Sequence, residues 1–109
     1  MEIDNETKEK IQEMQMYEQN FQNLMVKKQA FQIEFSETEN ALSEISKSKD
    51  EVFKMIWQII IKTDKEKVEK ELKQKKDLLS LRLKSIEKQE SELTKEIEEL
   101  KEDVMKRIK

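Results

Sequence analysis

The sequence of 109 residues contains no glycine, no proline, no cysteine and no histidine. Average usage would place about a dozen glycines and prolines in a chain of this length. Without them, tight turns have few places to form and a glycine-rich phosphate loop is excluded. The absence of cysteine excludes a disulfide framework, and the absence of histidine removes the commonest general base and metal ligand. We therefore expect no enzyme activity, no metal site and no cofactor.

Charged side chains dominate what is present. They make up 43% of the chain against 35% hydrophobic residues, and 22 basic and 25 acidic residues give a net charge of −3. The two signs interleave even in the lysine-rich stretch 65–76, so no basic face favours nucleic acid. The polar start MEIDNETKEK is not typical of a signal peptide, and no apolar run reaches the roughly 18 residues that span a bilayer. We expect a soluble cytoplasmic protein without nucleic-acid or membrane partners.

Two long segments carry seam residues at alternating intervals of three and four, the pattern of a left-handed coiled coil. The first seam is Met14, Tyr17, Phe21, Leu24, Lys28, Phe31, Phe35, Thr38, Leu42 and Ile45. The second seam is Leu72, Lys76, Leu79, Leu83, Ile86, Glu90, Leu93, Ile97, Leu100 and Val104. The apolar positions are too few and too linearly spread for a globular core. Each seam is therefore expected to pack against another helix.

Capping signals predict where the first helix begins and ends. Asp4 or Asn5 can cap a helix over about 5–46, with Glu6 in the first turn, where the helix dipole favours a negative charge. The stretch SEISKSKD, residues 43–50, reads as a linker because serine and aspartate favour caps and turns.

A second helix is predicted over about 64–108. Thr63 followed by Glu66 fits a capping box, which marks a helix start. Two helices of nearly equal length about a single reversal predict an antiparallel pair with both termini at the same end. We expect residues 1–109 to form a single domain.

The stretch VFKMIWQIIIK, Val52–Lys62, is the only concentrated apolar run. Its β-branched and aromatic residues favour a strand, whose alternation would give one wholly apolar face. That face would hold Phe53, Met55, Trp57, Ile59 and Ile61. A helix would also gather several of these residues on one side, so periodicity leaves both structures open. The run is too apolar to remain uncovered in a small soluble chain.

The segment EVFKMIWQIIIKTDKEKVEKELKQKKDLLSLRLKSIEKQE resembles the β-type subunits of prefoldin. The resemblance is carried by Val52-Phe53-Lys54, by Ile59-Ile60-Ile61-Lys62 and by the stretch 81–90. The upstream stretch LMVKKQAFQIEFSETENALSEI is similar to the first helix of that family, and the resemblance covers about residues 12–105. It implies a mainly α fold: a long antiparallel two-helix coiled coil with a short β-hairpin, about 51–62, at the connection. The family usually has glycine in the hairpin turn, where Trp57 or Gln58 stands here, so we expect a wider, bulged or displaced turn.

The resemblance also implies a function. A prefoldin β-type subunit contributes its hairpin to the shared β-barrel of a hexamer of two α-type and four β-type subunits. The coiled-coil tips hold unfolded polypeptides and deliver them to a group II chaperonin without ATP. The subunit-assembly residues would be Val52, Phe53, Met55, Ile56, Trp57, Ile59, Ile60 and Ile61.

The client-binding residues would lie near the two termini, where apolar positions exceed what one seam needs. They are Ile3, Ile11, Met14, Met16, Tyr17, Val104, Met105 and Ile108. Methionine adapts to varied partners, although frayed helix ends without a role are an alternative. Two other functions remain open: a structural coiled-coil tether or adaptor that binds no clients, and the helical arm of an enzyme such as a tRNA synthetase. The balanced charge disfavours the second, because an RNA-binding arm needs a basic face.

Overall fold

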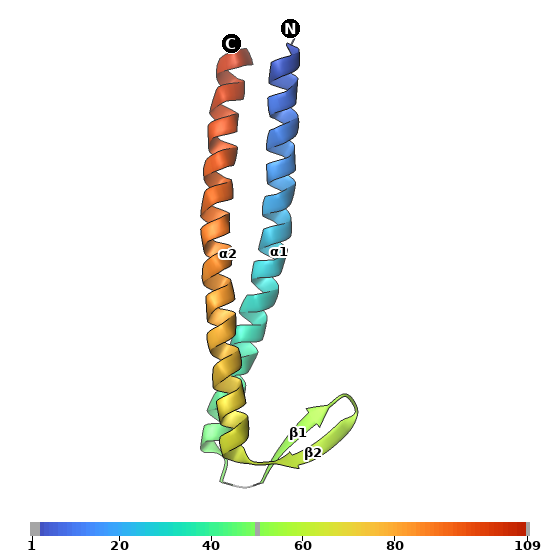
Figure 1. Cartoon of the computed structure of the whole chain (residues 1–109), viewed down its shortest axis with the longest axis vertical. Coiled ribbons are helices and arrows are strands. Elements are labelled where there is room, and N and C mark those ends of the chain that lie inside the picture. The colour runs from blue at the N-terminus through green and yellow to red at the C-terminus, as the bar shows by residue number, and fades with distance from the viewer. Residues whose placement is uncertain (1–2, 50, 109) are drawn as a thin grey trace. The chain divides into compact units, whose positions relative to one another are not determined.

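The structure is a computed structural model that describes residues 3–49 and 51–108. In chain order it contains helix α1 (Asn5–Lys47), strand β1 (Val52–Ile56), strand β2 (Ile59–Thr63) and helix α2 (Lys65–Ile108), as Figure 1 shows. This confirms the predicted mainly α fold, in which a short antiparallel β-hairpin joins two long helices. The element ends differ from the expected ones by at most one residue.

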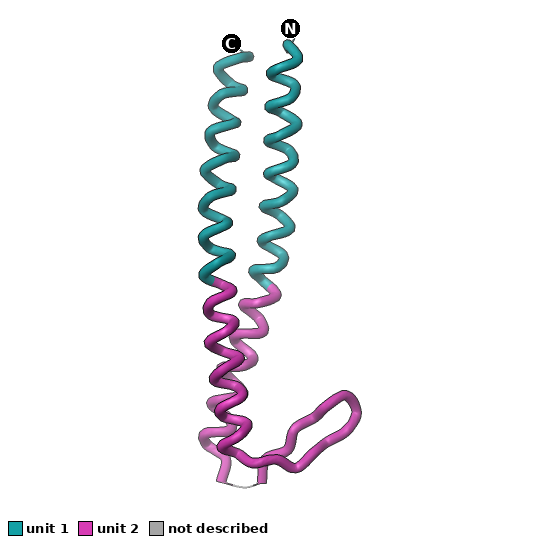
Figure 2. Tube along the Cα trace, in the orientation of Figure 1, with its two compact units in different colours: residues 1–29, 84–109 teal, residues 30–83 magenta. Residues whose placement is uncertain are grey.

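The chain divides into two compact units, drawn in different colours in Figure 2. Unit 1 consists of residues 1–29 and 84–109, and unit 2 consists of residues 30–83. Unit 1 therefore contains the beginning of α1 and the end of α2. Unit 2 contains the end of α1, the hairpin and the beginning of α2. The single-domain organisation stays a prediction.

Asp4 caps the start of α1. Its Oδ1 atom accepts a hydrogen bond from the Thr7 backbone N–H at 2.7 Å, and its carbonyl accepts one from the Lys8 N–H at 3.0 Å. The first N–H groups of a helix have no partner within the helix, and an aspartate at this position supplies one. Of the two predicted caps, Asp4 is thus the one used.

The start of α2 corrects the predicted capping box. Thr63 belongs to β2, where it pairs with Val52. Asp64 is the cap instead: its Oδ1 accepts a hydrogen bond from the Glu66 N–H at 3.2 Å, and its carbonyl accepts one from the Val68 N–H at 3.1 Å. Pairing with β1 holds Thr63 in the strand, so the next residue with a strong capping side chain begins the helix.

The end of α1 is tied to the start of α2 within unit 2. The Ser46 hydroxyl donates to the Ser43 carbonyl at 2.8 Å, and the Ser48 N–H donates to the Ile45 carbonyl at 3.1 Å. The Lys65 Nζ then donates to the Ser48 carbonyl at 2.7 Å. Helix α1 therefore ends within the predicted serine-rich linker, at Lys47.

Every position of the two predicted seams is buried or half-buried. Leu79 and Ile86 are the deepest of the apolar side chains. The seam of α1 continues one heptad further towards the N-terminus than predicted, to the buried Thr7. The helices are antiparallel neighbours in each unit. In unit 1 Lys10 pairs with Asp103 and Lys28 with Glu90, so later residues of α1 meet earlier residues of α2. In unit 2 Glu34 pairs with Lys75 and Ser48 with Lys65, in the same reversed order.

Two charged seam positions of unit 1 pair with each other across the helices. The Lys28 Nζ donates to Glu90 Oε2 at 2.8 Å, and both side chains are mostly covered. The hydrogen bond to Glu90 raises the pKa of Lys28 above its ordinary value, although partial burial opposes this shift. Lys28 and Glu90, which both interrupt the apolar pattern, therefore satisfy each other's charge.

The polar seam positions of unit 2 are also satisfied. The buried Thr38 hydroxyl donates to the Glu34 carbonyl one turn earlier at 2.8 Å. The Lys76 Nζ lies 3.5 Å from Glu39 Oε2 and 5.8 Å from the centroid of the Phe35 ring. Its charge thus meets a carboxylate and an aromatic face, while its stem covers the seam.

Candidate functional site

The hairpin is a regular antiparallel ladder with a two-residue connection. Its register runs from Val52 opposite Thr63 to Ile56 opposite Ile59. The connection is Trp57 and Gln58, and the five pairs follow one another without a bulge. The expectation of a wider, bulged or displaced turn was therefore wrong.

Trp57 makes the tight turn possible in place of glycine. Its φ angle is 59°, and it is the only non-glycine residue with a positive φ among the described residues. The left-handed region costs a residue with a side chain about 1–2 kcal/mol, because Cβ approaches the following carbonyl oxygen. The ladder on both sides of the turn holds the residue there.

The short turn also corrects the predicted apolar face. Residues directly opposite each other in a ladder point to the same side, and here Met55 is opposite Ile60 while Ile56 is opposite Ile59. Odd-numbered residues of β1 therefore share a face with even-numbered residues of β2. The first face carries Phe53, Met55 and Ile60, and the second carries Val52, Ile56, Ile59 and Ile61. The prediction that all odd-numbered residues share one face was wrong. Across a two-residue turn, odd-numbered residues of β1 lie opposite even-numbered residues of β2.

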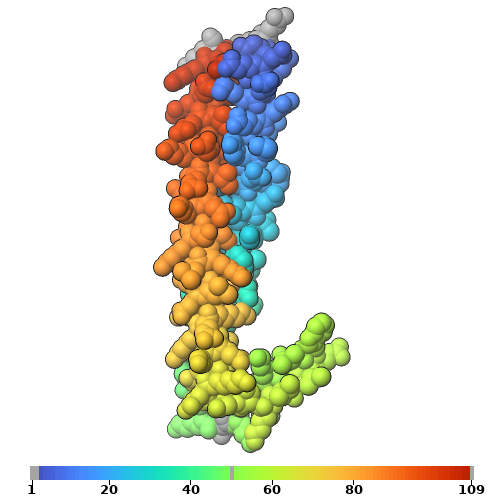
Figure 3. Space-filling model, in the orientation of Figure 1, coloured from blue at the N-terminus to red at the C-terminus, as the bar shows by residue number. Residues whose placement is uncertain are grey.

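Both hairpin faces are open to solvent. Phe53, Met55 and Ile60, on the first face, expose between 57% and 69% of their surface. The second face is also exposed except for Val52, which is buried. In Figure 3 the hairpin projects from the helices of unit 2. A two-stranded hairpin is marginally stable alone in water, and its free edges invite further strands.

Two ion pairs involve the hairpin among the residues that the structure describes. The Lys54 Nζ, on the second face, lies 3.1 Å from Glu71 Oε2 of α2, and the Lys62 Nζ lies 2.7 Å from Glu51 Oε1. The Lys62 and Glu51 side chains are largely exposed and those of Lys54 and Glu71 are partly exposed, and pairs open to solvent contribute only about 0–1 kcal/mol each. The apolar surface of the hairpin is therefore available for a partner.

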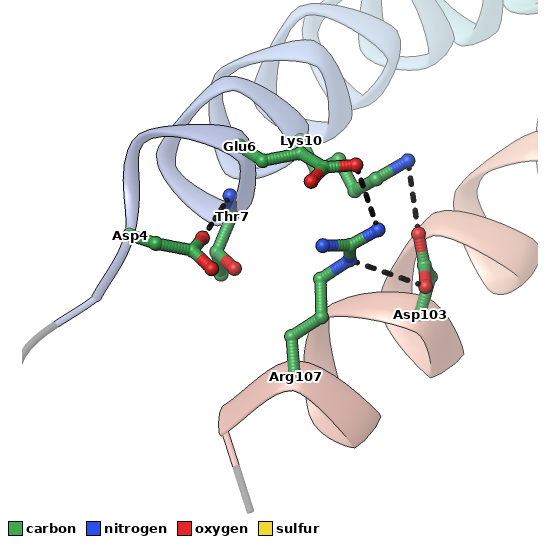
Figure 4. A network of polar contacts seen from close by, with 6 residues as sticks. All are labelled: Asp4, Glu6, Thr7, Lys10, Asp103 and Arg107. Atoms are coloured by element: carbon green, nitrogen blue, oxygen red, sulfur yellow. Dashed lines mark hydrogen bonds and ion pairs between the residues drawn. The ribbon is translucent and has the colours of Figure 1, made fainter.

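The second candidate region lies in unit 1, where the first turns of α1 meet the last turns of α2 (Figure 4). Arg107 Nη2 donates to Glu6 Oε1 at 2.9 Å, and Arg107 Nε lies 3.4 Å from Asp103 Oδ1. The Lys10 Nζ lies 2.9 Å from Asp103 Oδ2. This end network links the two helices beside the Asp4 cap.

The end network shifts the ionisation of its members. The hydrogen bond from Lys10, with the nearby charge of Arg107, lowers the pKa of Asp103 below its ordinary value of 3.8. The hydrogen bonds from Thr7 lower the pKa of Asp4 likewise. The hydrogen bond to Glu6 raises the pKa of Arg107. All these groups are thus held in their charged forms.

The eight predicted client-binding residues all belong to unit 1. Their exposure differs: Ile3, Met16 and Met105 are exposed, Ile11, Met14, Tyr17 and Ile108 are half-buried, and Val104 is buried. The exposed residues can meet a partner directly, whereas Val104 can do so only if the helix ends separate. The client-binding role of this set stays a prediction.

Sequence reasoning missed two features of unit 1. The first is the end network, for which the charges of Glu6 and Arg107 gave no signal without the helix register. The second is an open groove of about 700 Å³ further along the pair, whose apolar lining is Tyr17, Leu24 and Leu93 and whose other lining residues are polar. Those three residues appeared in the seams, but their polar neighbours carried no pattern of their own.

Within residues 3–49 and 51–108, no group of three or more acidic side chains is placed to hold a metal ion. None of the helices described is sufficiently long and apolar to span a membrane.

Comparison with known proteins relates the chain to one family. A family model described as "Prefoldin subunit" matches residues 8–109. The chain is 35% identical over 94 residues to prefoldin subunit beta of Thermococcus onnurineus, a match that covers 84% of this chain and 81% of the relative. It is 37% identical over 90 residues to prefoldin subunit beta of Thermococcus kodakarensis, covering 81% and 77%.

A solved structure shows the same fold. The crystal structure of the prefoldin beta subunit from Thermococcus strain KS-1 matches with a TM-score of 0.89 and 31% sequence identity. The match covers 96% of this chain and 94% of the other.

Proposed function

This chain belongs to the prefoldin subunit family, and we propose that it is an ATP-independent holdase that binds unfolded polypeptides and delivers them to a group II chaperonin. Membership in the family implies a chaperone-subunit role, not that of an enzyme, and assembly with other prefoldin subunits. The proposal covers client binding, delivery to the chaperonin, a hexamer with α-type subunits and a cytoplasmic location. It also includes the single-domain organisation.

The uncovered hairpin is the observation that carries the proposal. It exposes apolar side chains on both faces, and each buried isoleucine or methionine contributes about 1.5–3 kcal/mol. Joining a larger sheet covers these side chains, and closing that sheet into a barrel removes the free edges. A shared β-barrel built from the hairpins of several subunits meets both needs.

Client binding by unit 1 is supported by the exposed Met16 and Met105. Methionine side chains are flexible and fit partners of varied shape. Several subunits that hold one client gain from effective concentration, so each contact can be weak.

Native mass measurement tests assembly. The chain is measured alone and after mixing with an α-type prefoldin subunit from the same genome. A hexamer in the mixture is the expected result. A monomer in both samples would contradict the proposed assembly with other prefoldin subunits.

Suppression of aggregation tests client binding, with matched variants of one helix pair. The tip variant combines Met16→Gln with Met105→Gln, and the control combines Val26→Gln with Ile33→Gln. All four side chains are exposed and off the seams, so both variants should fold and assemble. The aggregation of a test protein diluted from denaturant is followed by light scattering. The tip variant should protect several-fold less per complex than the control, and equal protection would contradict client binding at Met16 and Met105.

The tether remains the second candidate, and the end network favours it. The ion pairs of Arg107 and Lys10 link the two helix ends, where Val104 is buried. A tether would assemble through the hairpin but leave aggregation of the test protein unchanged.

A further inference from the structure

We propose that the Trp57 indole is an anchor that inserts into an apolar pocket of the neighbouring subunit in the prefoldin complex. This inference rests on the proposed assembly through the hairpin. It adds a specific residue whose side chain fixes how two subunits meet.

The backbone of Trp57 is the first observation. Its φ of 59° lies in the left-handed region, which glycine enters without penalty and which is unfavourable for a bulky side chain. Asparagine or glycine at this turn position would avoid much of that penalty. Strained residues of this kind concentrate at functional sites, where another interaction offsets the strain.

The exposure of the side chain is the second observation. Trp57 exposes 93% of its surface, more than any other large hydrophobic residue described. The ladder holds the backbone of the turn, but the indole itself gains almost no packing within this chain. Tryptophan combines a large apolar area with few rotatable bonds and is enriched among the residues that dominate binding energy.

The surroundings of Trp57 define the partner. From Met55 to Ile61 the sequence carries no charge, and the flanking Ile56 and Ile59 are exposed as well. The matching pocket must therefore be apolar. The tight two-residue turn between paired strands gives the indole a defined attachment point, which suits a partner of fixed shape. Unfolded clients vary in shape and are better met by flexible side chains such as Met16 and Met105. A neighbouring subunit is thus the occupant that fits.

Trp57 is the only tryptophan in the chain, so it reports its own environment. The chain is produced with 5-fluorotryptophan and mixed with an unlabelled α-type subunit from the same genome. The single ¹⁹F signal should shift on assembly and become insensitive to the solvent. A signal that keeps its free-chain position in a complex of verified mass would overturn the inference.

Substitution separates the side chain from the backbone. Trp57→Gly removes the indole and also relieves the unfavourable φ, so the hairpin should form at least as easily. If the indole is an anchor, the apparent dissociation constant of the complex should rise at least tenfold, and Trp57→Phe should recover part of the loss. If Trp57 is merely a tolerated turn residue, Trp57→Gly should assemble equally well or more tightly, which would overturn the inference.

The outcomes also distinguish this inference from the proposed function. Normal assembly of the Trp57→Gly variant, with an exposed ¹⁹F label in the native complex, would remove the anchor and leave assembly through the hairpin standing. Failure of the native chain to assemble with any subunit would remove both. A label that shifts with an unfolded test protein, but not with subunits, would overturn the inference in favour of client binding at the turn.

Discussion

The paired helices and the hairpin treat their apolar residues in opposite ways. The helices cover most of their apolar side chains along one seam and present mainly charged side chains to water. The hairpin exposes isoleucines, methionine and phenylalanine on its two faces and tryptophan at its turn. The helices also satisfy their backbone groups internally, whereas a two-stranded sheet leaves both outer edges unpaired.

The difference separates two kinds of surface in one chain. The seams need only the other helix of the same chain, and their polar positions find partners there, as Lys28 finds Glu90. The hairpin finds little cover in its own chain beyond the buried Val52. The seams of the helices thus find their partners within the chain, and the hairpin is the surface through which we propose that subunits assemble.

The largest expected effect comes from placing charge on the hairpin. Ile59→Lys with Ile61→Lys charges the second face, and Met55→Lys with Ile60→Lys charges the first. Either pair should weaken assembly more than about a hundredfold, since two side chains each lose about 1.5–3 kcal/mol of apolar burial. Size-exclusion chromatography with light scattering measures the complex, and circular dichroism should show unchanged helicity.

The control for these variants is Leu78→Lys with Leu81→Lys, because both leucines are exposed on α2 outside the hairpin. The control should assemble normally. If both hairpin variants form a complex of native mass, the hairpin is not the assembly surface. The two regions would then not differ in their need for a partner subunit.

A smaller effect is expected from adjacent leucines of α2. Leu79 is 2% exposed and Leu78 is 48% exposed. Leu79→Ala should lower the free energy of unfolding by about 2–4 kcal/mol, because it removes buried atoms and leaves a cavity. Leu78→Ala should change it by less than about 1 kcal/mol. Urea unfolding followed by circular dichroism compares them, and equal losses would show that the seam is not the core of the helix pair.

The charged seam pair should give a still smaller change. Lys28→Met alone leaves the Glu90 carboxylate without its partner and should lower the unfolding temperature. Combining it with Glu90→Leu should restore that temperature or raise it, because an apolar pair can replace a partly buried ion pair. A double variant less stable than the single one would show that the ion pair itself stabilises the helices.

The smallest expected effect is the opening of the helix end at low pH. Interactions in the folded chain lower the pKa values of Asp4 and Asp103 below 3.8. Their contribution to stability is therefore present above the unfolded value and lost as the pH falls below 3.8 through the lowered pKa values. Between pH 5 and about pH 2, amide exchange corrected for intrinsic rates should accelerate near the helix ends before it does near Leu79.

Asp103→Asn provides the control for this titration. At neutral pH it should reproduce part of the faster exchange, since an amide cannot form the ion pairs with Lys10 and Arg107. Uniform acceleration along both helices on acidification would show that the end network does not act separately from the seam.

The local features of the fold were readable in the sequence. Spacings of three and four place side chains on one face of a helix wherever that helix lies, so both seams were assigned correctly. The Asp4 cap depends only on residues within one turn. The β-branched residues of the apolar run favoured a strand, but its periodicity alone was compatible with both a strand and a helix.

The features that the sequence did not fix depend on pairing. Thr63 suits a helix cap, and only its partner Val52 assigns it to β2 and moves the cap to Asp64. The two apolar faces of the hairpin depend on whether the turn has an even or odd number of residues. That number required Trp57 to adopt a positive φ, which sequence preference disfavours.

By itself the sequence determined two amphipathic helices, the kind of polar residue that caps them and an apolar insert. These features follow from side chains that are close together along the chain. Only the tertiary structure decided that Lys28 meets Glu90, 62 residues away, and that Arg107 meets Glu6. Such partners follow from the register of two antiparallel helices. A shift of one turn would preserve every seam position and every helix propensity, yet it would separate each of these pairs by about 5.4 Å.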